Sequence, residues 1–377
     1  MATRRTFLKT AAATGAAMLF DRVALDAQSG AAPGRASKPL DILILGGTGY
    51  IGPYQVRAAV ARGHRITVFN RGVSQADLPK GVMFLQGDRS IEKLDLKSLQ
   101  GKKWDAAIDN SQIDPAWVTK TAELLKDAVK YYLYVSSTGV YLPYLTPNIK
   151  EDIKPVLIDP GSNGTTTSYG VRKALSEIEN TKVFGDRAIN VRPNFIVGPG
   201  DPTPRFNYWP ARHARGGEIL VPGAKDDHVQ FADVRDLTAF MIHLIETGRT
   251  GTFNIAGDDK MTMERFQTAL VTAIPRKQTL TWISDMDFLR ANRLTAAIPW
   301  IPPRRNDKGE PYGQTYINSE KAEAAGLVYR PATDTIRDIL AWYEGLSDEA
   351  KKAMAFPITP ERESTILKAW HSRSPGS

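Results

Sequence analysis

Short apolar runs alternate with longer stretches of helical periodicity between residue 41 and about residue 200. A short apolar run bounded by turn residues is typical of a buried parallel strand. The expected strands are residues 41–45, 66–69, 82–85, 106–109 and 131–135. Strands that alternate with helices at this spacing predict an α/β fold with a Rossmann-type, doubly wound parallel sheet. Ligands of such sheets bind beyond the carboxyl ends of the strands.

The first expected strand leads directly into a glycine-rich turn. Gly46 permits the tight turn, Gly49 lets the backbone approach a pyrophosphate, and Gly52 lets the following helix pack closely on the strand. The helix and the second strand complete a βαβ unit of about 30 residues, and the helix N-terminus favours phosphate. We therefore predict a dinucleotide site rather than an ordinary loop, made by Gly46, Thr48, Gly49, Tyr50, Ile51 and Gly52.

The ends of the next strands bear on the type of cofactor. Asn70 and Arg71 follow the second strand, where an acidic residue would accept ribose hydroxyls and repel a 2′-phosphate. The missing carboxylate and the adjacent guanidinium favour NADP, while NAD stays open as the cofactor. The alternative is that Arg71 merely caps a surface turn. Asp88, after the third strand, is expected at the adenine edge, and Asn110 and Ser111, after the fourth, near the cofactor.

Candidate catalytic residues follow the fifth strand. Ser137 and Thr138 lie at its end, and Tyr169 and Lys173 are four residues apart in a helical segment, so they share a face. A lysine ammonium near a phenol stabilises the phenolate and lowers the pKa of the tyrosine toward working pH. A hydroxyl at the strand end can hold a substrate oxygen while a nicotinamide exchanges hydride. The pair alone arises by chance on amphipathic helices, but its combination with the glycine-rich turn indicates a catalytic site.

Together these motifs resemble the extended and atypical short-chain dehydrogenase/reductases, also called the NAD-dependent epimerase/dehydratase family. The resemblance rests on Gly46 to Gly52, on Ser137 with Val140-Tyr141, and on Tyr169 with Lys173. It continues through residues 191–200, 231–237 and 251–257 and covers roughly residues 40–345.

The resemblance implies a role for each catalytic candidate. Tyr169 is the implied general acid/base, and Lys173 lowers its pKa and holds the ribose. Ser137 orients the substrate, because it lies three residues before Val140 as the hydroxyl does in the family. Thr138 is the substitute for Ser137 and a candidate substrate contact.

A smaller C-terminal substrate lobe is also implied. Residues 191–200 match the sixth strand and nicotinamide-side loop of the family, which implies Pro193 at the cofactor and Asn194 at the substrate. Arg205 and Arg235 are the candidate arginines for a substrate phosphate or carboxylate. A solvated basic helix is the alternative for the region around Arg205.

Two proline-rich segments are expected to cover the site, and the first of them is a departure from the family. The long, proline-rich gap between Ser137 and Tyr169 predicts an enlarged loop over it. Residues 299–313 hold too many prolines for a helix and predict a lid or a strap between lobes. The predicted organisation is a signal at 1–27, a linker at 28–38, the NAD(P)-binding domain at 39–200, a substrate lobe at 201–345 interleaved with the last Rossmann elements, and tail helices at 346–377.

The N-terminus resembles a twin-arginine export signal. Arg4-Arg5 precedes Phe7-Leu8-Lys9 and an apolar run from Ala11 to Phe20, which is too short for a transmembrane anchor. This predicts that the twin-arginine export machinery carries the folded chain to the periplasm or the cell exterior. A disordered basic tail is the alternative.

Composition narrows the function further. The net charge of +8 is scattered, so no nucleic-acid partner is expected. The chain has no cysteine, which excludes disulfides and a thiol nucleophile, and its five histidines lack ligand spacing, so no metal is expected. We expect a reductase, dehydrogenase or epimerase that uses NADP or NAD on a carbonyl or hydroxyl of a small polar, sugar-like substrate. The alternative is a non-catalytic dinucleotide-binding scaffold, an RNA-binding fold relative included; a monomer and a homodimer both stay open.

Overall fold

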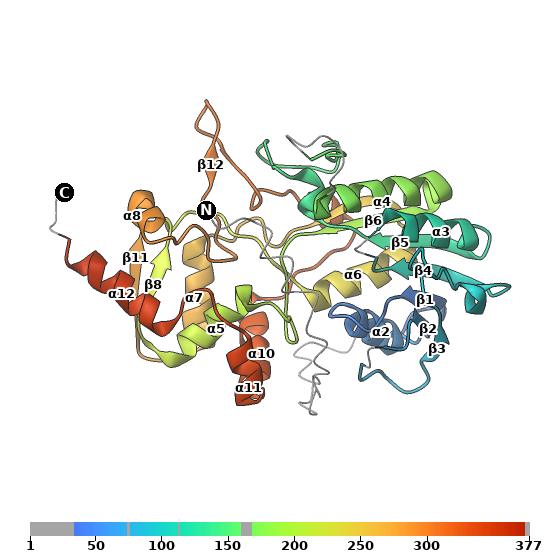
Figure 1. The fold of residues 1–377 in the computed structure, drawn as a ribbon, viewed down its shortest axis with the longest axis horizontal. Helices are drawn as coiled ribbons and strands as arrows, with labels where there is room; N and C mark the ends of the chain where they lie inside the picture. The colour runs from blue at the N-terminus through green and yellow to red at the C-terminus, as the bar shows by residue number, and fades with distance from the viewer. Residues whose placement is uncertain (1–33, 74–75, 112–113, 160–167, 374–377) are drawn as a thin grey trace.

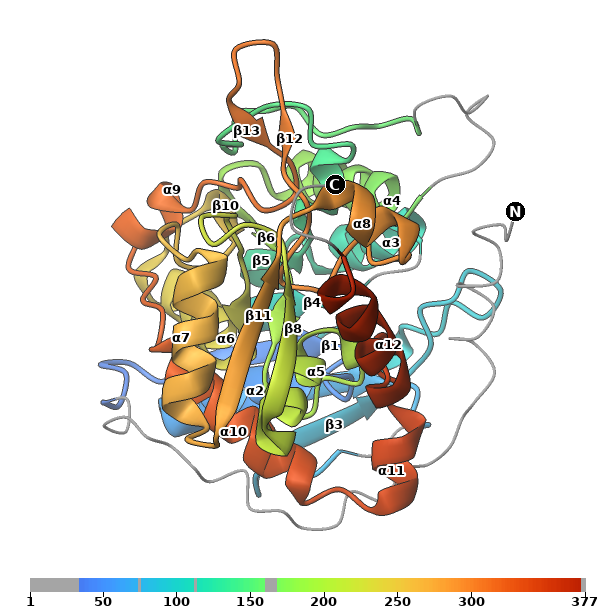
Figure 2. The same cartoon turned by 90° about the vertical axis from the view of Figure 1, so that its left-hand side faces the viewer.

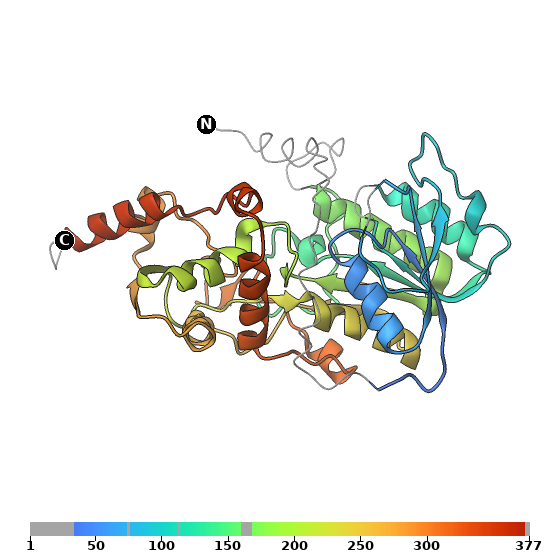
Figure 3. The same cartoon turned by 90° about the horizontal axis from the view of Figure 1, so that it is seen from below.

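The computed structural model describes residues 34–73, 76–111, 114–159 and 168–373. It has two lobes, one around a large sheet and the other around helices and short strands (Figure 1 and Figure 3). The predicted export signal at 1–27 and the first part of the linker lie outside the described residues. Among the described helices, none combines the length and the apolar character that a membrane crossing requires.

The sheet lobe contains a seven-stranded parallel sheet in the order β10-β6-β5-β4-β1-β2-β3. The strands are β1 (Asp41–Leu45), β2 (Arg65–Asn70), β3 (Met83–Gln86), β4 (Trp104–Asp109), β5 (Val129–Val135), β6 (Ala188–Pro193) and β10 (Gly251–Ile255). The predicted α/β Rossmann-type sheet is confirmed. β4 and β5 begin two residues earlier than predicted, because Trp104 and Val129 pair in register although polar residues follow them. The strand order reverses between β1 and β4, where ligands of such sheets bind.

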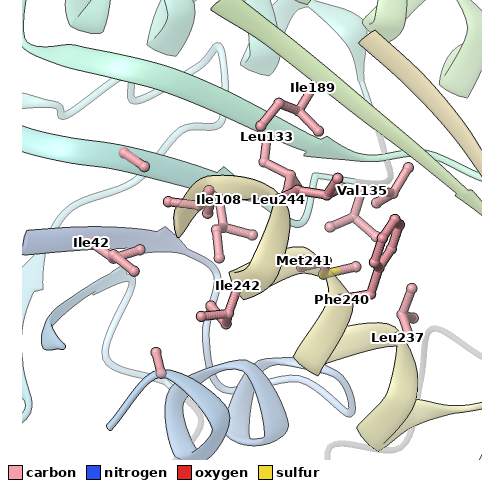
Figure 4. Close-up of a cluster of buried hydrophobic side chains, with 14 of the residues drawn as sticks. Ile42, Ile108, Leu133, Val135, Ile189, Leu237, Phe240, Met241, Ile242 and Leu244 are labelled. Atoms are coloured by element: carbon pink, nitrogen blue, oxygen red, sulfur yellow. The ribbon is translucent and has the colours of Figure 1, made fainter. Parts of the chain in front are cut away.

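Helices cover both faces of this sheet. They are α2 (Gly52–Ala61), α3 (Pro115–Leu125), α4 (Tyr169–Phe184) and α6 (Val234–Thr247). Figure 4 shows Leu237, Phe240 and Met241 of α6 against the apolar side chains of the strands. α2 packs beside α6 on that face, and α3 packs beside α4 on the other. The buried layers hold the carboxyl ends of the central strands in fixed positions.

The second lobe is built after β6. Its elements are α5 (Pro204–Arg215), β8 (Gly217–Pro222), α7 (Met263–Ala273), β11 (Gln278–Ile283), α8 (Met286–Ala291), α10 (Ala332–Glu344), α11 (Asp348–Ala353) and α12 (Pro360–His371). Its core is rich in aromatic rings, such as Phe206, Trp209 and Phe266. The helices predicted as a tail bury Ile366 and Leu367 in this core. α12 is therefore an integral part of the second lobe.

The proline-rich segment forms a hairpin of β12 (Arg304–Arg305) and β13 (Pro311–Tyr312) that projects beside the loop after β5 (Figure 2). Arg304 Nη2 donates to the carbonyl oxygens of Pro143 and Tyr144, at 2.5 and 2.6 Å. Residues 313–318 then cross between the lobes, and we call them the strap. Ile317 exchanges two hydrogen bonds with the side chain of Gln230 and bridges to Ile149 on the sheet side.

Candidate active site

A cavity of about 650 Å³ lies at the carboxyl ends of the central strands, where β1 and β4 diverge. Both lobes contribute to its walls, because residues from the glycine-rich turn and residues at the start of α5 line it together. The predicted site residues that line it are Gly46, Gly49, Tyr50, Ile51, Gly52, Ser137, Thr138, Tyr169, Lys173, Pro193, Asn194 and Arg205.

The glycine-rich turn has the geometry of a phosphate cradle. Gly46 adopts a φ of +89°, which favours glycine. A Cβ on Gly52 would overlap the backbone of Gly47, so the start of α2 packs directly on the turn. A Cβ on Gly49 would meet no protein atom within 4 Å, so it would fill the space of the cavity. The turn and the N-terminus of α2 therefore fit the pyrophosphate of a dinucleotide.

A reciprocal amide pair fixes the next part of this wall. Gln55 Nε2 donates to Asn110 Oδ1 at 2.9 Å, and Asn110 Nδ2 donates to Gln55 Oε1 at 2.8 Å. Gln55 is fully buried on α2, whereas Asn110 lines the cavity directly after β4. The pair thus ties the end of β4 to the helix that follows the glycine-rich turn.

Five predicted cofactor residues do not line the cavity: Thr48, Asn70, Arg71, Asp88 and Ser111. Asn70 Oδ1 accepts from the backbone N–H of Gly72, and Arg71 is exposed beside it. The Asp88 carboxylate accepts from the N–H of Ser90, which lowers its pKa.

The other two, Thr48 and Ser111, form hydrogen bonds with residues that line the cavity. Thr48 donates its backbone N–H to the carbonyl oxygen of Gly46 within the turn. Ser111 is buried and offers its carbonyl oxygen to Lys173.

Close packing of two helices brings the catalytic candidates together. Tyr169 is the first residue of α4, which Ser168 caps, and Ser137 caps the short 3₁₀ turn η2 (Thr138–Tyr141) through the N–H of Gly139. A Cβ on Gly170 would overlap the carbonyl oxygen of Gly139. The glycine therefore lets α4 press on η2, and Tyr169 and Ser137 face each other across this contact.

Tyr169 is 44% exposed, but into the cavity that it lines. Burial raises the pKa of its hydroxyl, while a hydrogen bond with Ser137 and the charges of Arg172 and Arg205 lower it. Burial prevails, so the phenol form dominates at neutral pH. This corrects the expectation that Lys173 brings the pKa of Tyr169 down.

Lys173 lies beneath the tyrosine and is 1% exposed. Its Nζ donates to the carbonyl oxygens of Ser111 and Val135 at 2.7 and 2.6 Å, and it lies 5.7 Å from the centre of the Tyr169 ring. Burial lowers the pKa of Lys173 to about 7, although the negative charges of Asp109 and Glu177 act to raise it. The ammonium is thus directed at backbone carbonyls rather than at the phenol oxygen.

A buried polar cluster below Lys173 was not predicted. Asp109, at the end of β4, accepts from Arg89 Nη1 at 2.7 Å and from the Tyr132 hydroxyl at 2.6 Å. The only signal in the sequence is a carboxylate directly after the apolar residues 106–108. Its negative charge favours the protonated form of Lys173.

The substrate side of the cavity faces the second lobe. Thr138 Oγ1 donates to Asn194 Oδ1 at 3.3 Å, and Asn194 Nδ2 donates to the carbonyl oxygen of Gln314 in the strap at 3.0 Å. Arg205 lies over the Phe195 ring, 5.6 Å from its centre. Sequence reasoning did not find Gln314 or Phe195, nor Tyr144, Asp201 and Thr203, all of which line the cavity.

Arg235 does not line the cavity, contrary to its predicted role at the substrate. Its Nε and Nη2 donate to the two carboxylate oxygens of Asp233 at 2.9 and 2.7 Å, and its Nη1 donates to Asp338. These ion pairs occupy the guanidinium. Arg235 joins the start of α6 to α10 and is a structural residue.

Comparison with known proteins decides the family. The model of the NAD dependent epimerase/dehydratase family matches residues 42–256. The chain belongs to this family. Membership supports an NAD-dependent enzyme.

The names of two similar proteins point to different functions. The chloroplast stem-loop binding protein of 41 kDa b from Arabidopsis thaliana is 28% identical over 257 residues, 63% of this chain and 64% of that protein. The chain thus spans slightly less than two thirds of this relative. The 2'-dehydrokanamycin reductase of Streptomyces kanamyceticus is 28% identical over 138 residues, 37% of this chain and 39% of that protein.

Solved structures of other proteins share the fold, one sugar epimerase among them. The Bordetella bronchiseptica enzyme WbmG in complex with NAD and UDP is 18% identical, with a TM-score of 0.59 over 85% of this chain and 99% of that chain. The UDP-N-acetylglucosamine 4-epimerase from Bacillus cereus is 17% identical, with a TM-score of 0.57 over 80% of this chain and 98% of that chain. At these identities the likeness concerns the fold alone.

Proposed function

We propose that the chain is an NAD(P)-dependent oxidoreductase or epimerase that acts on a carbonyl or hydroxyl group of a small, sugar-derived substrate. One observation carries the proposal. Ser137, Tyr169 and Lys173 lie on the walls of the same cavity as the glycine-rich phosphate cradle. A proton-transferring phenol and a dinucleotide site in one cavity are what carbinol–carbonyl chemistry requires.

A nicotinamide ring, when bound, supplies or accepts the hydride. The Tyr169 hydroxyl gives a proton to the substrate oxygen during reduction and takes it back during oxidation. The Ser137 hydroxyl, which lies against Tyr169, holds the same oxygen by a hydrogen bond. Because burial raises the pKa of Tyr169, the resting phenol is ready to donate to a carbonyl oxygen.

Lys173 contributes position and charge. An ammonium has three donors, and two of those on Lys173 are held by the carbonyl oxygens of Ser111 and Val135. The third donor is free to serve a ribose hydroxyl of the cofactor. Since the pKa of Lys173 is about 7, its charge changes in the neutral range.

NADP is the proposed cofactor, with NAD as the competitor. Asn70 and Arg71 put no carboxylate at the end of β2, and the exposed Arg71 guanidinium suits a 2′-phosphate. The proposal includes export by the twin-arginine machinery, because Arg4-Arg5 and the residues after them have that pattern. An exported enzyme of this kind needs a cofactor that stays bound from one turnover to the next.

The test follows the absorbance of reduced nicotinamide in purified chain, loaded with NADP or NADPH, on addition of sugars and keto-sugars. We expect Tyr169→Phe to lower the turnover rate by about 10²- to 10⁴-fold, because the proton donor is lost. Nucleotide affinity stays unchanged, since the cradle is intact. Tyr343→Phe, in α10 of the second lobe, is the control.

If Tyr169→Phe turns over substrate as fast as the wild-type chain, the phenol is not the acid/base and the proposal fails. If the chain binds the dinucleotide but neither changes its absorbance nor converts any sugar to another product, it is a scaffold instead.

A further inference from the structure

A residue that lines the cavity has one carboxylate oxygen without a hydrogen-bond donor. Asp201 is 2% exposed and lines the cavity. Its Oδ1 accepts from the N–H and the hydroxyl of Thr203, at 2.9 and 2.8 Å. Among the described residues, no group donates to the buried Oδ2. A buried carboxylate oxygen without a donor is costly and is rare in folded proteins.

The backbone around Asp201 keeps the carboxylate in this position. The N–H of Asp201 donates to the carbonyl oxygen of Gly198 at 3.2 Å, and the Tyr50 hydroxyl donates to the same oxygen at 3.3 Å. Asn207 Nδ2 donates to the carbonyl oxygen of Asp201 at 2.9 Å. The backbone of Asp201 is thus tied to the glycine-rich turn on one side and to α5 on the other, and the two Thr203 bonds hold its carboxylate.

Arg205 lies close to this carboxylate. Its Nε donates to Thr203 Oγ1 at 2.9 Å, and that hydroxyl in turn donates to Asp201 Oδ1. The two charged groups are therefore joined through one hydroxyl without forming a direct ion pair. Burial raises the pKa of Asp201 above its ordinary value, and the Thr203 bonds and the Arg205 charge oppose this effect only in part. The Nη atoms of Arg205 form no hydrogen bond with any described residue, and the side chain lines the cavity.

The charges decide which ligand group fits. An anionic group at Oδ2 would be repelled by the carboxylate, and an ammonium group would be repelled by the guanidinium. A neutral hydroxyl can donate to Asp201 and accept from Arg205. Two neighbouring hydroxyls of a sugar ring can do both at once.

We propose that Asp201 and Arg205 form a diol subsite, in which Asp201 Oδ2 accepts from one substrate hydroxyl and Arg205 donates to its neighbour. The inference rests on the proposed function and deepens it, because it names a vicinal diol as the part of the substrate that is recognised. The subsite selects polyhydroxylated substrates over simple aldehydes and ketones, since a ligand without the hydroxyl leaves the carboxylate unpaired.

The experiment measures binding to the NADP-loaded chain by calorimetry. The probes are glucose, galactose, xylose, UDP-glucose and UDP-N-acetylglucosamine. We expect at least one of them to bind, and Asp201→Asn to weaken that probe by about 10- to 100-fold, because the acceptor at Oδ2 becomes a donor. Arg205→Gln, a change at a half-buried residue, is the second variant, with a loss of about tenfold.

Single-deoxy forms of the same sugar identify the contact. Removing the hydroxyl that meets Asp201 should cost the wild-type chain as much as Asp201→Asn costs with the parent sugar. The variant should then lose nothing further with that deoxy probe. Asp287→Asn, at an exposed carboxylate of α8, is the matched control.

Three results overturn the subsite: no probe binds, Asp201→Asn and Arg205→Gln leave sugar affinity unchanged, or Asp201→Asn weakens NADP instead of sugar. The last result would assign the carboxylate to the cofactor amide. Failure of the proposed function looks different, because the wild-type chain would then bind neither NADP nor NAD, or Tyr169→Phe would have no effect on turnover.

Discussion

Both lobes bury charged side chains, but they use them differently. In the sheet lobe, Lys173 is a buried residue of the cavity wall, and the charge of Asp109 behind it favours the protonated ammonium. In the second lobe, Arg212 and Glu363 form a buried pair that does not reach the cavity. The comparison shows that a buried charged side chain indicates a functional site only where it borders a ligand cavity. In the second lobe, the buried pair joins two helices instead.

Removing one partner of the buried pair in the second lobe should have the largest effect on stability. Glu363 on α12 accepts from Arg212 Nε at 2.5 Å and from the N–H of Leu220 at 3.1 Å. We expect Glu363→Gln to lower the free energy of unfolding by roughly 3–5 kcal/mol, because Arg212 stays buried without its counter-charge. Urea denaturation measures the change.

Glu361→Gln is the control on the same helix, because Glu361 is exposed. Folded Glu363→Gln protein should still bind NADP with wild-type affinity, since the cradle belongs to the sheet lobe. Equal stability of the two variants would show that the second lobe does not depend on this pair.

Lowering the pH should reduce the stability of the second lobe, because His213 is buried there in its neutral form. This histidine is fully buried on α5 beside Gln267, and burial lowers its pKa to about 4 from an ordinary 6.5. The unfolded chain takes up the proton at higher pH, so the stability contribution is complete above pH 6.5 and is lost as the pH falls toward 4. The loss is roughly 2–3 kcal/mol.

Thermal unfolding of wild type and His213→Asn between pH 7 and pH 4.5 measures this loss. The variant starts less stable, and the gap between the two should narrow as the pH falls. His371→Asn, at an exposed histidine of α12 that pairs with Glu218, should alter the pH dependence far less, because an exposed ion pair contributes little to stability. A constant gap would contradict the buried neutral imidazole.

Two glycines of the cradle separate stability from ligand space in the sheet lobe. We expect Gly52→Ala to cost roughly 1–3 kcal/mol, because the new Cβ overlaps the backbone of Gly47. Gly49→Ala should leave stability unchanged, since its Cβ meets no protein atom, but should weaken NADP binding at least as much. Calorimetry measures NADP binding, and chemical denaturation measures stability. If Gly49→Ala binds NADP normally, the pyrophosphate does not lie on this turn.

The smallest expected effect concerns the choice of cofactor. Arg71→Ala should weaken NADP by about tenfold, or roughly 1.4 kcal/mol, and leave NAD affinity unchanged, because only NADP carries the 2′-phosphate. Arg65→Ala, at the opposite end of β2, is the control. Equal losses for both cofactors, or none, would show that Arg71 only caps the turn.

The sequence predicted the sheet and the cradle well, because their signals are local. An apolar strand, three spaced glycines and a helical period lie within a few turns of one another and specify one βαβ unit. The side chains that need distant partners were less accessible. Arg235 lies in a segment that resembles the family, yet its partner Asp338 is more than a hundred residues away. The pair of Arg212 and Glu363 has the same non-local character.

The direction of a side chain was equally hard to predict. The four-residue spacing of Tyr169 and Lys173 placed them on one face of α4, which the structure shows. It did not indicate that two backbone carbonyls hold the Lys173 ammonium, or that burial keeps the pKa of Tyr169 high. Such outcomes depend on the packing of β4, β5 and α4 against one another.

The strap has a consequence for the size of the substrate. The side chains of Asn194 and Gln230 form hydrogen bonds with its backbone at Gln314 and Ile317, so this wall of the cavity is held at two points. Under the proposed function, a nicotinamide and its reaction partner share this cavity of about 650 Å³, and Gln314 of the strap limits the room on the substrate side.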